Sequence, residues 1–235
     1  MRSKLEQFKR IFKIGRIVAV DFRRRPPHGS SCHVDTYCTA LARTFLKGGT
    51  LVFGRGYPQA CAGGNYFFSR ALPKREVEDF YLEEEKSFGS RAACRGFLSA
   101  LPRLPEKLRD QYLVLEEFTG SKKVSVLLFL VDPAQAGRLL GLLAFKRFYR
   151  SEILPGQPAC VSLFAPLSKK GPHLNLIDHY DREYQGRQGG EKLWPEDKLL
   201  LSLSYQDFQE ILSNMEKSFY GASETGPEPA PFEAV

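Results

Sequence analysis

The sequence predicts an α+β (mixed α/β) protein whose residues 1–220 form a single globular domain. Short β-rich apolar runs, such as 17–22 and 124–131, alternate with segments in which apolar residues recur at helical spacing. Of the 235 residues, 43% are hydrophobic and 26% are charged, which is enough apolar material for a core in a chain of this length. Residues 221–235 are rich in proline and glutamate and predict a disordered tail.

Helices are predicted where apolar side chains recur every three to four residues and capping residues precede them. These segments are 4–13, 37–45, 74–86, 90–101, 133–148 and 205–219. The first has lysine and arginine opposite its apolar side, and we interpret it as a helix packed on the protein's own core rather than a membrane-surface anchor. Segments 74–86 and 90–101 are interpreted as scaffold.

Strands are predicted where β-branched and apolar residues run between turn residues. These segments are 17–22, 50–53, 124–131, 161–164, 174–177 and 199–204. Residues 185–191 are too polar and too rich in glycine to predict regular structure. Residues 54–64 form a turn-dense loop in which the backbone can approach a ligand closely.

The two halves of the chain, residues 14–105 and 120–220, share one order of features. Each has a strand, a helix and a turn-rich loop that ends in a cysteine, Cys61 in the first half and Cys160 in the second. This order indicates an internal duplication of a strand-helix-strand unit around a mixed sheet. The duplication predicts that Val18 and Val126 belong to one sheet with buried faces.

Composition limits the cellular setting and the partners. The first residues lack the apolar core of a secretion signal, and no apolar run is long enough to cross a bilayer, so we expect a soluble cytoplasmic protein without a membrane span. Its five cysteines should then be reduced, which favours thiol, metal or packing roles. A net charge of +7 is compatible with nucleic acid, acidic metabolites or anionic surfaces as partners.

Three cysteines are the leading candidates for chemistry. Cys38, Cys61 and Cys160 stand near helix starts or turn-rich loops, where thiolates can bind an iron-sulfur cluster or, alternatively, zinc. Such a site would be assembled from distant segments, because the chain contains no C-x-x-C pair. Packing alone could also explain each cysteine, and Cys32 and Cys94 are not required for the site.

Further ligand-binding candidates are glycines of the turn-dense loop 54–64 and polar residues elsewhere. They are Arg55, Gly63, Gly64, Arg138, His173, Asn175 and Arg182. His173 and Asn175 begin a polar stretch that also contains Asp178 and Asp181. The alternative interpretation of that stretch is a hydrogen-bonded loop and strand edge.

Common catalytic motifs are absent from the sequence. No P-loop, no dinucleotide-binding glycine motif after a strand and no G-x-S-x-G elbow occurs, which disfavours nucleotide hydrolysis and serine hydrolysis. Basic residues are scattered and form no recognised DNA- or RNA-binding module, so nucleic acid is an unlikely partner.

Several short segments together resemble the uncharacterised prokaryotic ArCR family, a family of unknown function. They are Ile17-Val18-Ala19-Val20, Cys38-Thr39-Ala40-Leu41, Cys61-Ala62-Gly63-Gly64, Asp132-Pro133-Ala134-Gln135-Ala136, Ala159-Cys160 and Leu201-Ser202-Leu203-Ser204-Tyr205. The resemblance covers most of residues 14–215 and implies one continuous domain with Cys38, Cys61 and Cys160 as a group. The chain departs from the family pattern at 177–182.

The leading hypothesis is therefore a cofactor-binding protein in which the three cysteines hold an iron-sulfur cluster or another metal, in a redox or ligand-activation role. Its partner would be a small-molecule ligand or a redox protein. A non-catalytic module that binds a small anion or a partner protein is the alternative, and RNA binding is a further one.

Overall fold

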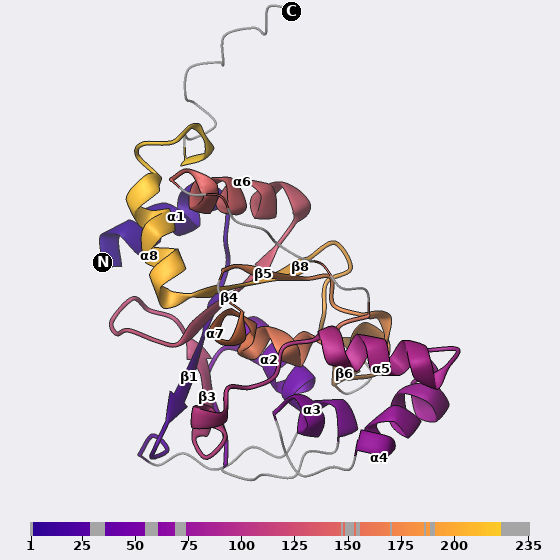
Figure 1. The fold of residues 1–235 in the computed structure, drawn as a ribbon. Coiled ribbons are helices and arrows are strands. Elements are labelled where there is room, and N and C mark those ends of the chain that lie inside the picture. The colour runs from indigo at the N-terminus through magenta and orange to yellow at the C-terminus, as the bar shows by residue number, and fades with distance from the viewer. Residues whose placement is uncertain are drawn as a thin grey trace, which may run out of the picture.

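The computed structural model describes residues 2–28, 36–54, 61–68, 74–146, 148, 153, 156–169, 171–185, 187–188 and 191–221. In this part of the chain, one central sheet carries helices on both faces, and α1, α6 and α8 lie on the opposite side of the sheet from α2, α3, α4 and α5 (Figure 1). The predicted single α+β domain is confirmed. Of the predicted tail, 221–235, Gly221 ends the 3-10 helix η5 (Phe219–Gly221), and residues 222–235 lie outside the described residues.

The sheet has six strands in the order β2-β3-β1-β4-β8-β5, and every neighbouring pair is antiparallel. The strands are β1 (Ile17–Arg23), β2 (Thr50–Phe53), β3 (Tyr112–Glu117), β4 (Val126–Val131), β5 (His173–Asn175) and β8 (Leu199–Ser204). The prediction of a mixed sheet is wrong. β1 and β2 do run in the same direction, but β3, which the sequence analysis missed, lies between them and pairs with both in the antiparallel sense.

The first face of the sheet packs against α1 (Arg2–Phe12), α6 (Pro133–Ala144) and α8 (Tyr205–Asn214). Phe8 of α1 meets Phe129 of β4 and Phe208 of α8, with ring centroids 6.0 and 5.2 Å away. The interpretation of residues 4–13 as a helix on the protein's own core is therefore confirmed. Asp132 caps α6 through a capping box with Gln135, as its place before Pro133 predicts.

The second face carries the remaining helices. They are α2 (Tyr37–Lys47), α3 (Ala62–Phe67), α4 (Lys74–Asp79), α5 (Arg91–Ala100) and α7 (Ala165–Ser168), with the π-helices η1 (Phe80–Glu84) and η4 (Asp181–Gln185) and the 3-10 helices η2 (Glu106–Leu108) and η3 (Ala159–Leu163). A last 3-10 turn, η5 (Phe219–Gly221), follows α8. Along β1, Ile17 and Ala19 face the first core while Val18 and Val20 face the second, as the period-two geometry of a strand requires.

The predicted pairing of the two halves in one sheet is confirmed. Val18 lies opposite Leu128, and Val20 lies opposite Val126, in the β1–β4 ladder. The helices that follow these strands, α2 and α6, nevertheless belong to the cores on opposite faces. A two-fold relation between adjacent antiparallel strands would place both helices on one face of the sheet. The positions of α2 and α6 therefore do not support the duplication, which stays a prediction.

Two local predictions are wrong. Residues 161–164 do not form a strand. Residues 161–163 end the 3-10 helix η3 and Phe164 is its C-cap, because Pro158 begins a turn in which its carbonyl accepts the Val161 N–H. Within 185–191, β6 (Arg187–Gln188) and β7 (Glu191–Lys192) pair as a short antiparallel ladder.

No helix in the described ranges is long and apolar enough to cross a membrane.

Candidate functional site

The three cysteines predicted as a group come together in the core of the second face. Each stands at a helix start: Cys38 lies in the first turn of α2, Cys61 is the N-cap of α3, and Cys160 is the second residue of η3. Cys38 and Cys160 are buried, and Cys61 is partly buried. The Cys61 sulfur accepts the Gly64 N–H at 3.3 Å, which is how a capping side chain satisfies the free amide of a helix start.

Hydrogen bonds link two of the thiols to a carboxyl. Cys38 is hydrogen-bonded to Cys160 and to Asp181, the first residue of η4. The hydrogen bond with Cys160, burial and the nearby acids raise the pKa of Cys38 well above its ordinary value. Burial also raises the pKa of Cys61, and the charge of Cys160 adds to this effect, while the Gly64 N–H opposes it. The thiols of Cys38 and Cys61 are therefore protonated at neutral pH in this arrangement.

Two aspartates extend the cluster. Asp181 is buried, and its Oδ2 accepts the Ala159 N–H at 2.5 Å, directly before Cys160. Asp178 accepts the Asp181 N–H at 2.7 Å. Burial and the neighbouring Asp181 raise the pKa of Asp178 to about 9, and burial raises the pKa of Asp181. These carboxyls bind protons that an exposed aspartate would release.

Tyr81 and Glu85 also interact with the members of this cluster. Burial raises the pKa of Tyr81, with Cys61 as the next cause, and burial raises the pKa of Glu85 to about 7. A Cβ on Gly63 would lie 2.5 Å from the Tyr81 hydroxyl and 3.8 Å from the Cys61 sulfur, so glycine is required at this contact. A Cβ on Gly64 would lie 3.1 Å from the Tyr37 ring. Because glycine has no Cβ, these two positions leave room for the Tyr81 hydroxyl and the Tyr37 ring of the protein itself.

We name this group the thiol–carboxyl cluster. Its members are Cys38, Cys61, Tyr81, Glu85, Cys160, Asp178 and Asp181. Burial is the largest cause of the raised pKa of Cys61, Tyr81, Glu85, Asp178 and Asp181, and the hydrogen bond with Cys160 is the largest cause for Cys38. No lysine or arginine is among the causes for these six groups. All of these groups release a proton when they ionise, so ionisation of any one of them makes ionisation of the others harder.

The thiols and carboxyls of the cluster are suitable ligands for a thiophilic cation, but their present arrangement is not that of a metal site. Thiolate and carboxylate are both metal ligands. In the described part of the chain, however, no three His, Cys, Asp or Glu side chains are arranged to hold a metal ion. Cys38, Cys160 and Asp181 are connected by hydrogen bonds, whereas Cys61 interacts with Cys160 through charge only.

Arg182 and Asn175, predicted to bind ligand, hold the backbone that carries the two aspartates. Arg182 donates to the carbonyls of Leu176, Ile177, Pro195 and Lys198. Asn175 donates to the Pro158 carbonyl at 3.0 Å and accepts the Ile177 N–H at 2.6 Å. Both side chains therefore position the segment that reaches the cluster.

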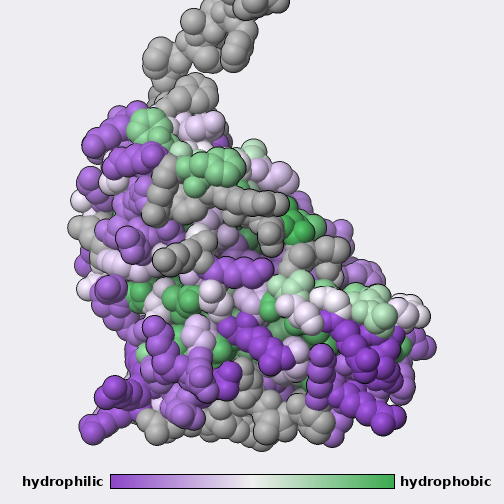
Figure 2. Space-filling view, viewed as in Figure 1, coloured by the Kyte–Doolittle hydropathy of each residue, from purple (hydrophilic) through white to green (hydrophobic). Residues whose placement is uncertain are grey.

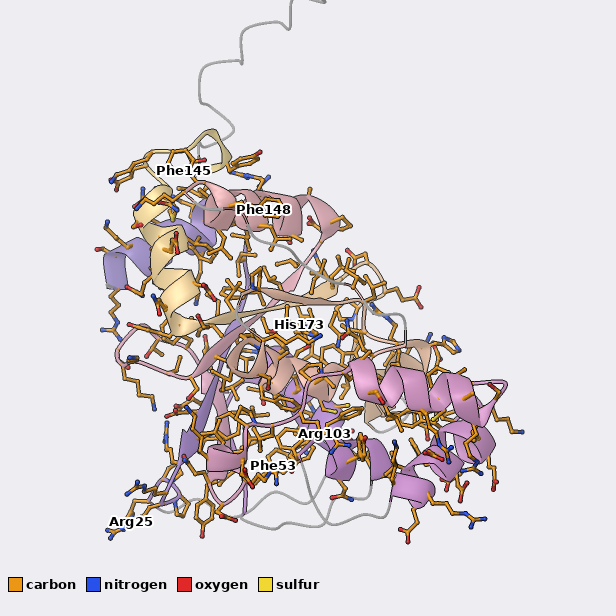
Figure 3. The ribbon with its side chains drawn as sticks, in the orientation of Figure 1. Arg25, Phe53, Arg103, Phe145, Phe148 and His173 are labelled. Atoms are coloured by element: carbon orange, nitrogen blue, oxygen red, sulfur yellow. The ribbon has the colours of Figure 1, made fainter. Side chains whose placement is uncertain are left out.

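The other predicted residues are not brought to the cluster. His173 begins β5 at the edge of the sheet (Figure 3), where burial lowers its pKa to about 4. Arg138 lies with α6 on the first face, where it donates to the Tyr220 carbonyl and stacks on the Phe12 ring. Arg55 and Cys32 lie outside the described residues. Cys94 is buried in α5 and has no part in the hydrogen bonds of the cluster.

Tyr81 and Glu85 were missed by the sequence analysis, which interpreted residues 74–86 as scaffold. No motif marks them. α4 continues into the π-helix η1, and Glu85 follows η1 directly. Single π-helical turns are rare and often occur at functional sites, but sequence periodicity does not reveal them. Asp178 and Asp181 had a sequence signal, since both belong to the polar stretch that begins at His173.

A family model described as "Uncharacterised ArCR" matches residues 14–214. No curated protein and no solved structure matches the chain. The match spans the whole thiol–carboxyl cluster and the sheet beneath it.

Proposed function

We propose that this chain, which belongs to the uncharacterised ArCR family, binds an iron-sulfur cluster or a thiophilic metal ion through Cys38, Cys61 and Cys160. One observation carries the proposal: Cys38, Cys160 and Asp181, which come from separate segments, are connected by hydrogen bonds, and Cys61 interacts with this group through charge. The role that follows from a thiolate-bound metal is redox or ligand activation.

The protonation of the cluster supports a cation as its ligand. Burial and the neighbouring acidic groups hold Cys38, Cys61 and Asp178 in their neutral forms, and no lysine or arginine is among the causes that act on their pKa values. A thiophilic metal ion replaces protons on thiols, because the thiolate is the ligand and the positive charge compensates it. Soft thiolates favour zinc and iron-sulfur clusters over magnesium or calcium.

The surrounding groups have clear supporting roles in such a site. The Gly64 N–H already points to the Cys61 sulfur and would stabilise it as a thiolate. Asp181 is able to take part as a fourth ligand or to accept the Cys38 proton, while its bond to Ala159 N–H holds the start of η3. Coordination requires the start of α3 to close on the Cys38–Cys160 pair, since Cys61 lacks a hydrogen bond to either.

Metal analysis after anaerobic purification tests the proposal. We expect bound iron with sulfide, or zinc, in the full chain, and visible absorption if a cluster is present. Cys61→Ser should remove at least about 90% of the metal, because a neutral hydroxyl replaces a soft thiolate poorly. Cys94→Ser is the matched control and should retain it, since Cys94 belongs to α5.

Zinc addition in weak buffer should also release protons, in proportion to the thiols that become ligands. The proposal fails if the protein remains metal-free after reconstitution with zinc and with iron plus sulfide. It also fails if Cys61→Ser binds as much metal as the unmodified chain.

A further inference from the structure

A second concave site lies between α4 and α5. It is a pocket of about 580 Å³ lined by Lys74, Arg75 and Glu78 of α4 and by Arg91 and Arg95 of α5. None of these residues belongs to the thiol–carboxyl cluster. Figure 2 shows a strongly hydrophilic surface at the lower right of the view, where Figure 1 places the two helices.

Helix geometry brings these side chains together. Lys74 and Glu78 are one turn apart on α4, and Arg91 and Arg95 are one turn apart on α5, so each pair projects from one side of its helix. The two sides face each other, because the carboxyl of Glu78 contacts both arginines.

Glu78 fixes the two guanidinium groups. Its side chain is only 2% exposed, and it accepts from Arg95 Nε at 2.8 Å and from Arg91 Nη1 at 3.1 Å. Arg91 also donates from Nη2 to Asp79 at 2.6 Å. The hydrogen bond from Arg95 is the first cause that lowers the pKa of Glu78, and the bond from Arg91 also contributes. The carboxylate therefore stays ionised and holds both arginines in place.

The pocket keeps an excess of positive charge with unused donors. Four cationic side chains line it, against the carboxylates of Glu78 and Asp79. Arg95 uses only Nε for Glu78, its terminal nitrogens have no partner within the described ranges, and its side chain is 57% exposed. Lys74 has no ion pair within the same ranges.

We propose that this pocket binds a small molecule through a diphosphate or similar polyphosphate group. The free end of a guanidinium matches two oxygens of a phosphate, and Arg95 is held in place by its other nitrogen. Lys74 adds a flexible point charge beside it. The volume falls within the usual range for small-molecule sites, about 300 to 1,000 Å³. The site is independent of metal binding at the thiol–carboxyl cluster.

Calorimetric titration with inorganic pyrophosphate at fixed ionic strength tests this site. We expect saturable binding to the full chain, weakened at least about tenfold in Arg95→Gln and in Lys74→Gln, because each removes one charge-assisted contact. Lys4→Gln is the control, since it removes the same charge from an exposed position on α1, on the other side of the sheet.

Lys74→Gln is the decisive variant because no ion pair in the described chain depends on Lys74. Equal weakening by Lys4→Gln would mean attraction by net charge alone and would overturn the proposal, as would no binding of pyrophosphate. A single-stranded RNA oligonucleotide that binds more tightly than pyrophosphate, with an affinity that falls steeply with salt, would also overturn it in favour of nucleic acid.

Discussion

Raising the pH from 5 to 9 is expected to lower the free energy of unfolding by about 3 kcal/mol or more. The folded protein keeps protons on Asp178 up to a pKa of about 9 and on Glu85 up to about 7, whereas the unfolded chain has released both above pH 5. The unfolded state then binds fewer protons, so stability is present at low pH and is lost as the pH rises through the folded pKa values. His173 acts oppositely, but only between pH 4 and 6.5.

Urea unfolding of the reduced, metal-free protein at pH 5, 7 and 9 measures this dependence. Asp178→Asn should flatten the curve, because the amide does not titrate, while Asp110→Asn should leave it unchanged, since Asp110 is exposed. Zinc should restore stability at high pH if the cluster binds it, because the metal replaces the protons. Stability that stays constant or increases between pH 7 and 9 would contradict the assignment of buried, protonated carboxyls.

The sequence predicted those helices and strands whose apolar spacing or capping residues match the standard pattern of one element type. The stripe of Leu5, Phe8 and Phe12 identified α1, and Asp132 followed by Pro133 identified the start of α6. β3 was missed although Leu113, Val114 and Leu115 are all buried. Its apolar run ends at Glu116 and is shorter than the run of six apolar residues, 126–131, that identified β4.

The candidate site was predictable only in part, for a related reason. Cysteines near helix starts carry a sequence signal: Cys38 and Cys160 are hydrogen-bonded to each other, and Cys61 interacts with them through charge. The sequence around an arginine does not show which groups its guanidinium will contact. Arg182 lies in a polar stretch that suggested ligand binding, yet its guanidinium is used by backbone carbonyls. The contacts of Tyr81 and Glu85 depend on how η1 packs against the rest of the protein, and no local sequence pattern predicts that packing.

Arg182→Ala is expected to destabilise the protein by about 3 kcal/mol or more and to release metal bound by the cluster. The guanidinium serves four carbonyls, including those of Leu176 and Ile177. Ile177 has a φ of +55°, a left-handed conformation that is strained for a β-branched residue. Without Arg182, this turn loses the bonds that hold it, and Asp181 loses its position beside Cys38.

Chemical unfolding of Arg182→Ala, Arg182→Lys and Arg10→Ala provides the comparison. Lysine keeps the charge but has a single nitrogen, so Arg182→Lys should recover less than half of the lost stability. Arg10→Ala should change stability by less than about 0.5 kcal/mol, because Arg10 is an exposed residue of α1. If the lysine variant is as stable as the unmodified protein, charge and not the four-carbonyl geometry explains Arg182. If Arg182→Ala unfolds like Arg10→Ala, the arginine does not hold the turn at all.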